Sequence, residues 1–196
     1  MKPLKRMLAL LLALVVAVTM VACGESSNDN SGSSSVSASS VVDIEAQIEK
    51  TVMDGINGSR NEDVSVLVND PDLQTKSMDA LGYIQNNEKV AAKYAIQVNA
   101  ELNSVNGIVT VGMVAIVTDE LYTYNEDDYA LLDEDAMLTP IEVTMDNAEQ
   151  VALDIVEAES DEEQELIDAI TRFGVAAKTI NGKTYMAVAF CYDLAS

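Results

Sequence analysis

The C-terminal part of the chain constrains its fold more than any other segment. Two apolar segments, 173–178 and 183–192, flank the dipeptide Asn181-Gly182. Asn-Gly between apolar segments is the strongest short-range signal of a β-hairpin, because both turn residues need positive φ. In the second segment both alternating sets are apolar, Met186, Val188 and Phe190 on one side and Tyr185, Ala187, Ala189 and Cys191 on the other.

A strand that is apolar on both faces needs a covering layer on each face. The chain also contains segments with helical periodicity, which can supply those layers. The sequence therefore predicts an α+β fold, a three-layer α-β-α sandwich with a mainly antiparallel sheet.

Two helices are predicted in the N-terminal half of the folded part. Ser40, with Asp43 three residues later, has the pattern of a helix start, and apolar residues then recur at helical spacing to about Asn57. Asp70-Pro71 predicts the start of the second helix, since Asp is a good N-cap and Pro is favoured at the first helical position. The apolar face of this second helix is formed by Leu73, Ser77, Leu81 and Ile84.

The remaining elements are predicted from shorter patterns. Residues 88–102 have apolar residues at helical spacing, but their Val and Ile content leaves a strand open. Residues 107–117 predict a buried strand, and residues 146–158 predict a helix. Ser160 and Glu163 form a capping box that opens a last helix, whose apolar residues are Leu166, Ile167 and Ile170.

The order of these elements resembles the CAP superfamily, which comprises cysteine-rich secretory, antigen 5 and pathogenesis-related proteins. The resemblance is carried by Ile56-Asn57 with Arg60, by the segment 66–73, by the helix that ends at Ser160, and by the two strands of the hairpin. It covers roughly residues 45–85 and 145–192. The resemblance implies a three-layer α-β-α sandwich, in agreement with the doubly apolar last strand.

The resemblance does not extend to the family's metal cleft. An intact cleft in this family has two His and two acidic residues, whereas this chain has no His. Glu163 is nearest to the position of the second His, and it is also the predicted capping-box partner of Ser160. We therefore expect no metal, no cofactor and no catalytic residue to carry over from the family. The lack of His also excludes His-ligated zinc, Ser-His-Asp triads and Cys-His dyads.

The chain is strongly acidic, with 33 Asp and Glu against 11 Lys and Arg. Such a surface repels nucleic acid and anionic lipid headgroups, so nucleic acid is not an expected partner. The most acidic segment is Glu126–Asp135. It lacks the Asp spacing and the Gly of an EF-hand, and a solvated loop and a weak calcium site both remain open.

The N-terminus has the pattern of a bacterial lipoprotein signal. Basic residues at positions 2, 5 and 6 precede an apolar segment, 7–22, that is short for a transmembrane helix. It ends in Met20-Val21-Ala22-Cys23-Gly24, which resembles a lipobox, although Met20 stands where Leu is usual. The resemblance implies lipidation of Cys23 and cleavage before it; an ordinary signal or an uncleaved anchor are the alternatives.

The predicted organisation has three parts. Residues 1–22 form the signal peptide, residues 23–40 the lipidated Cys and a flexible Ser/Asn/Gly tether, and residues 41–196 the CAP-like domain. With Cys23 lipidated, Cys191 has no disulfide partner, and its apolar neighbours predict a small buried side chain.

We therefore expect an extracytoplasmic lipoprotein, anchored to the bacterial membrane through Cys23, with a non-catalytic binding domain. Its partner is expected to be a protein, a peptide or an envelope polymer. Two alternatives remain, a cell-envelope hydrolase that uses carboxylates or Lys, and a structural envelope lipoprotein.

The lipobox can be tested directly. Cys23→Ser removes the thiol that receives the lipid, so the variant should take up no radiolabelled fatty acid and should leave the membrane fraction. The wild-type chain, labelled in parallel, is the control. Label incorporated equally by both proteins would contradict lipidation at Cys23.

Overall fold

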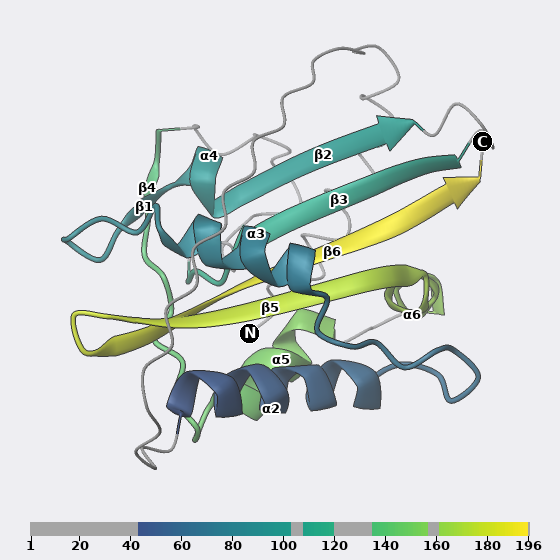
Figure 1. Ribbon diagram of the computed structural model, residues 1–196, viewed down its shortest axis with the longest axis horizontal. Coiled ribbons are helices and arrows are strands. Elements are labelled where there is room, and N and C mark those ends of the chain that lie inside the picture. The colour runs from purple at the N-terminus through teal and green to yellow at the C-terminus, as the bar shows by residue number, and fades with distance from the viewer. Residues whose placement is uncertain (1–42, 103–107, 120–134, 157–160, 196) are drawn as a thin grey trace.

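A computed structural model describes residues 43–102, 108–119, 135–156 and 161–195 (Figure 1). Its centre is a four-stranded, wholly antiparallel sheet with the strand order β2-β3-β6-β5. Strands β2 and β5 therefore form the two edges, and β6 lies inside. The strands are β2 (Ile96–Leu102), β3 (Ile108–Ile116), β5 (Ile170–Ile180) and β6 (Lys183–Ala195).

The hairpin that the sequence predicts is confirmed. Strands β5 and β6 pair from Ile180 and Lys183 outward, and the two residues between them have positive φ, 53° at Asn181 and 83° at Gly182. Both values are those that a two-residue hairpin turn requires. Strand β5 is longer than predicted, because Ile170 begins this strand and does not belong to the preceding helix.

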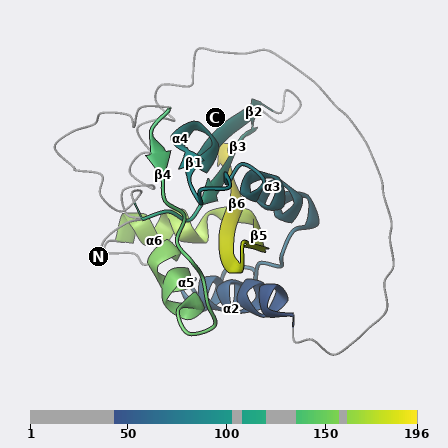
Figure 2. The same cartoon turned by 90° about the vertical axis from the view of Figure 1, so that its left-hand side faces the viewer.

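Helices cover both faces of the sheet (Figures 1 and 2). Helices α2 (Ile44–Gly58), α5 (Ala148–Val156) and α6 (Asp161–Asp168) contribute to one core, whereas α3 (Pro71–Leu81) packs on the opposite face. The three-layer α-β-α sandwich predicted from the last strand is therefore correct. A short two-stranded sheet of β1 (Val90–Ala91) and β4 (Met137–Leu138) flanks the α3 side.

Strand β6 is buried on both faces, as its sequence predicts. Met186, Val188 and Phe190 belong to the core beneath α2 and α5. Tyr185 and Ala187 belong to a second core with α3, and all five residues are at most 3% exposed. Burial of large apolar side chains on both faces contributes roughly 1.5–3 kcal/mol for each one.

Both predicted N-terminal helices are present, with one correction at the first. Asp43 is the N-cap of α2, since its carboxylate accepts a hydrogen bond from the backbone N–H of Ala46. The predicted cap, Ser40, lies outside the described residues. Asp70 caps α3 as predicted and accepts from the N–H groups of Asp72 and Leu73.

The helical interpretation of residues 88–102 is wrong. This segment forms β1, a single helical turn α4 (Ala92–Ala95) and then β2, every residue of which pairs with β3. Long-range pairing with the predicted strand over residues 107–117 therefore outweighs the local periodicity, and the β-branched Ile96 and Val98 fit that pairing.

Several predictions fall outside the part of the chain that the structure describes. They concern the signal peptide, Cys23, the tether, Ser160 and the acidic segment up to residue 134. Glu163 lies in α6, but its side chain is also outside the described part. None of the described helices is long and apolar enough to cross a membrane.

The outer edge of β5 is closed by side chains from other elements. The side-chain amide of Asn69 pairs with both the N–H and the C=O of Val175, at 2.9 and 3.0 Å. The carboxylate of Glu49 accepts from the N–H of Ala177 at 2.9 Å, and that of Glu45 accepts from Thr179 at 2.6 Å. This edge therefore has few backbone groups left for another strand.

Helix α3 approaches β5 most closely at Gly174. A Cβ atom at this position would lie 2.5 Å from the Cβ of Leu73 and 2.5 Å from the backbone nitrogen of Gln74. The missing side chain therefore sets the distance between the α3 layer and the sheet.

Gly174→Ala should destabilise the fold by about 3 kcal/mol or more, because backbone atoms of α3 must move to make room. Gly112→Ala is the matched control in strand β3, since its nearest contact would be an ordinary 3.6 Å. The control should change stability by less than about 1 kcal/mol. Urea denaturation followed by circular dichroism measures both, and equal effects would contradict this account of the α3 contact.

Candidate binding groove

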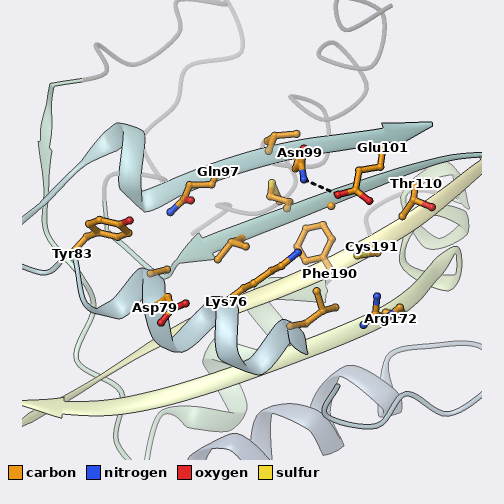
Figure 3. A pocket seen from close by; sticks show the side chains of 16 residues that line it. Lys76, Asp79, Tyr83, Gln97, Asn99, Glu101, Thr110, Arg172, Phe190 and Cys191 are labelled. Atoms are coloured by element: carbon orange, nitrogen blue, oxygen red, sulfur yellow. Dashed lines mark hydrogen bonds between the residues drawn. The ribbon is translucent and has the colours of Figure 1, made fainter. Parts of the chain in front are cut away.

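A groove lies beside α3 on its face of the sheet, over strands β2 and β3 (Figure 3). Its volume is about 510 Å³. It exists because α3 is centred over β5 and β6 and leaves part of the β2–β3 surface uncovered. Polar side chains dominate its rim, namely Lys76, Asp79, Gln97, Asn99, Glu101, Thr110 and Arg172. We call it the α3–β2 groove.

The floor of the groove is apolar and has little side-chain bulk. Gly112 has no side chain, and its neighbour across the strand pair, Cys191, is 7% exposed. Burial raises the pKa of the Cys191 thiol, more than the nearby positive charges of Arg172 and Lys76 lower it. The thiol therefore stays protonated at neutral pH, which confirms the prediction of a small buried side chain and disfavours a nucleophilic role.

Lys76 is the most distinctive charge of the groove. It is exposed on α3, and its side chain reaches over the strands (Figure 3). Asp72 and Asp79 lie four residues before and three residues after it, at spacings that favour ion pairs on a helix. Among the described residues, however, Lys76 forms no salt bridge with either carboxylate. Its ammonium group is therefore available to an anionic ligand.

Arg172 lies at one end of the groove and is already paired. Its guanidinium donates to both carboxylate oxygens of Asp70, at 2.8 and 2.9 Å. Hydrogen bonding from Arg172 lowers the pKa of Asp70, and the N–H groups at the start of α3 lower it further. This bidentate pair fastens the start of α3 to β5 and so fixes that end of the groove.

Strand β2 supplies the wall opposite α3. Gln97, Asn99 and Glu101 alternate along the strand, so their side chains share the groove face of the sheet. All three are exposed, and the amide of Asn99 donates to the Glu101 carboxylate at 3.3 Å. The wall therefore presents amide and carboxylate groups in a row.

An aromatic pair stands at the other end. The rings of Tyr83 and Tyr94 are stacked, with centroids 4.3 Å apart and planes inclined by 6°. Tyr83 lines the groove and is 46% exposed. The Lys93 ammonium lies 5.6 Å from the centroid of the Tyr94 ring, within cation–π distance. The pair gives the groove a flat aromatic edge, suited to a sugar ring or an apolar side chain.

The residues that carry the family resemblance are structural in this protein. The side chain of Asn57 pairs with both the N–H and the C=O of Leu67, at 2.8 and 2.9 Å. Arg60 donates to the carbonyl oxygens of Ser65, Asp168 and Ile170. Both side chains hold the loop between α2 and α3 and lie away from the groove.

The site residues predicted from the sequence take no part in this groove. Cys23 and most of Glu126–Asp135 lie outside the described residues, and Asp135 is paired with Lys93 at 2.6 Å. Within the described ranges, no three Asp, Glu or Cys side chains are close enough to hold a metal ion.

The groove residues were missed for a definite reason. Gln97, Asn99 and Glu101 line one wall only when residues 96–102 are a strand, whereas the sequence leaves helix and strand open for this segment. Their alternation with Ile96, Val98 and Ala100 was the available signal.

Comparison with known protein families, with curated proteins and with solved structures finds no match to this chain. The chemistry of the groove is therefore the basis for proposing a function.

The Asp70–Arg172 pair generates a pH prediction. The folded-state pKa of Asp70 lies below its ordinary value of 3.8, so the pair stabilises the fold above that pH, and the contribution is lost as the pH falls through the lowered pKa. Asp70→Asn keeps an N-cap but loses the ion pair, so it should cost about 1 kcal/mol or less at pH 7, given the exposure of Arg172.

The cost of Asp70→Asn should be smaller at about pH 2 than at pH 7, because protonation of the wild-type carboxyl, which abolishes the ion pair, sets in as the pH falls. Urea denaturation at both pH values measures the difference, and Asp63→Asn, in the exposed loop, is the control. A cost that is the same at both pH values would contradict the ion-pair explanation.

Proposed function

We propose that this chain is a lipid-anchored extracytoplasmic binding protein, with a CAP-like domain that acts without catalysis. We further propose that the α3–β2 groove is its binding surface. The ligand is an extended envelope polymer whose repeating unit carries carboxylate and amide groups.

The observation that carries this proposal is the unpaired cation above an apolar floor. Lys76 has two acidic neighbours on its own helix, yet it forms no salt bridge with any described residue, so its ammonium group can pair with a ligand. A hydrogen bond to a charged group contributes about 1.5–3 kcal/mol. Lys76 thus supports recognition of a carboxylate on the ligand.

The two ends and the wall of the groove support an extended ligand. The amides of Gln97 and Asn99 both donate and accept hydrogen bonds, and they lie along the strand direction. The stacked Tyr83–Tyr94 pair offers a flat face at one end. A polymer with ring and amide groups matches this sequence of contacts better than a compact metabolite does.

The N-terminal pattern supports the same location. A lipid on Cys23 and a tether over residues 23–40 place a domain within reach of the envelope. About eight basic residues would remain after removal of residues 1–22, against 33 acidic ones. With so few cations, the position of Lys76 inside a groove is informative.

The test is co-sedimentation of the full chain, in detergent, with purified cell-wall polymer from the same bacterium. Lys76→Met should weaken binding about tenfold or more, because it removes one charge-assisted hydrogen bond. Lys178→Met is the matched control, because it removes the same charge from β5, outside the groove.

The control should bind the polymer as the wild type does. If both variants weakened polymer binding equally, the loss of one positive charge anywhere on the protein would explain the effect. This result would contradict the groove proposal. No co-sedimentation of the wild-type chain would contradict the proposed ligand class.

A further inference from the structure

The two edges of the sheet differ sharply. The outer edge of β5 is closed by side chains of Asn69, Glu49 and Glu45. On the outer edge of β2, no described residue forms a backbone hydrogen bond with Ile96–Leu102. About half of the N–H and C=O groups of an edge strand point away from the sheet, and on β2 no described residue pairs with these groups.

Among the described residues, the only device on β2 that protects an edge is the charge of Glu101. All seven of its residues pair with β3 without a register shift, and the strand contains neither Pro nor Lys. Edge strands are commonly blunted by such residues, by bulges or by shortness. Val98 is 39% exposed on the face opposite the groove, next to the partly buried Ile96 and Ala100. This apolar row continues the main core to an open edge.

We propose that a second copy of this chain occupies this edge, through antiparallel pairing of β2 with its counterpart about a two-fold axis at Asn99. The two sheets then become one continuous sheet. This pairing goes beyond the proposed function, although the side chains of the same strand form one wall of the groove.

The residue order of β2 is self-complementary in this register. Gln97 faces the partner's Glu101, and Glu101 faces the partner's Gln97, so each carboxylate meets an amide donor. On the opposite face, Val98 meets the partner's Ala100 and the apolar row is covered. Both a polar pair and an apolar pair therefore match in chemistry across the proposed interface.

The acidic charge of the chain is compatible with this pairing. The two Glu101 carboxylates are offset by four residues along the strands, a separation of about 14 Å. The Debye length is about 8 Å at physiological ionic strength, so their repulsion is largely screened. Added salt should therefore strengthen the association.

A single strand pair is a small interface, short of the roughly 1,200 Å² typical of stable complexes. Two chains confined to one membrane meet at high local concentration, which favours such a contact. The two-fold axis stands perpendicular to the sheet, so both α3–β2 grooves open on the same side and their β2 walls lie next to each other. The dimer would thus present one wider groove to an extended ligand.

The test is disulfide cross-linking of the full chain in cells, read on non-reducing gels. Asn99→Cys should form a covalent dimer, because paired residues of adjacent strands have Cα atoms about 4.5–5.5 Å apart, within disulfide reach. Gln97→Cys and Glu101→Cys should each give about tenfold less dimer alone, yet should cross-link when the two variants are co-expressed. The wild-type chain and Glu149→Cys, an exposed site on α5, are the controls.

Dimer from Gln97→Cys or Glu149→Cys at the level of Asn99→Cys would indicate random collision and overturn the proposal. A cross-link of Asn99→Cys to a different protein, or no cross-link at all, would overturn it as well. Adding Lys76→Met to Asn99→Cys should leave the dimer unchanged, so failure of ligand binding and failure of dimerisation are distinguishable.

Discussion

Burial of strand β6 on both faces is the constraint on which the rest of the structure depends. Met186, Val188 and Phe190 require a layer on one side, and Tyr185 and Ala187 require a layer on the other. Helices α2 and α5 supply the first layer. The second comes mainly from one short helix, α3, which is pressed onto β5 at Gly174. Because an eleven-residue helix cannot cover four strands, the surface over β2 and β3 stays open, and the groove follows from the same constraint.

Closing the β5 edge costs solvation of the Glu49 carboxylate, and no described residue bears a comparable cost at β2. Glu49 accepts hydrogen bonds from Ala177 and Gln74, both of which lower its pKa, yet burial raises that pKa above its ordinary value. The protein thus keeps a partly desolvated carboxylate in order to satisfy one edge. At β2 it keeps no comparable side chain in the described part of the chain. The β5 edge is closed by a carboxylate that loses part of its solvation, whereas no described side chain closes β2. This contrast is the physical basis for the proposed pairing of two copies.

The sequence predicted the layers better than it predicted the groove, and the reason is local. Asn181-Gly182 and Asp70-Pro71 fix their elements through neighbouring residues, so both were predicted correctly. Within residues 88–102, β1 and β2 form through pairing with β4 and β3, partners that local periodicity does not contain. Lys76 could be placed on a helix face, but the lack of an ion pair there is a property of the three-dimensional arrangement alone.

The use of basic residues supports a role for Lys76 beyond solubility. Lys93 of α4 pairs with Asp135, and Lys183 of β6 pairs with Glu88, so both lysines link an element to a loop. Arg172 pairs with Asp70, and Arg60 donates to the backbone carbonyl oxygens of Asp168 and Ile170. Lys178 on β5 also forms no salt bridge with a described residue, and Lys76 differs from it by lying in the groove.

Lys76 stands over the low floor at Gly112 and Cys191 without a carboxylate partner in the described structure. Its ammonium group lies in a groove whose opposite wall carries the amides of Gln97 and Asn99 and the carboxylate of Glu101. In the proposed function, a carboxylate of the ligand would supply the ion pair that Lys76 lacks in the described structure, and this favours an anionic polymer over a neutral one.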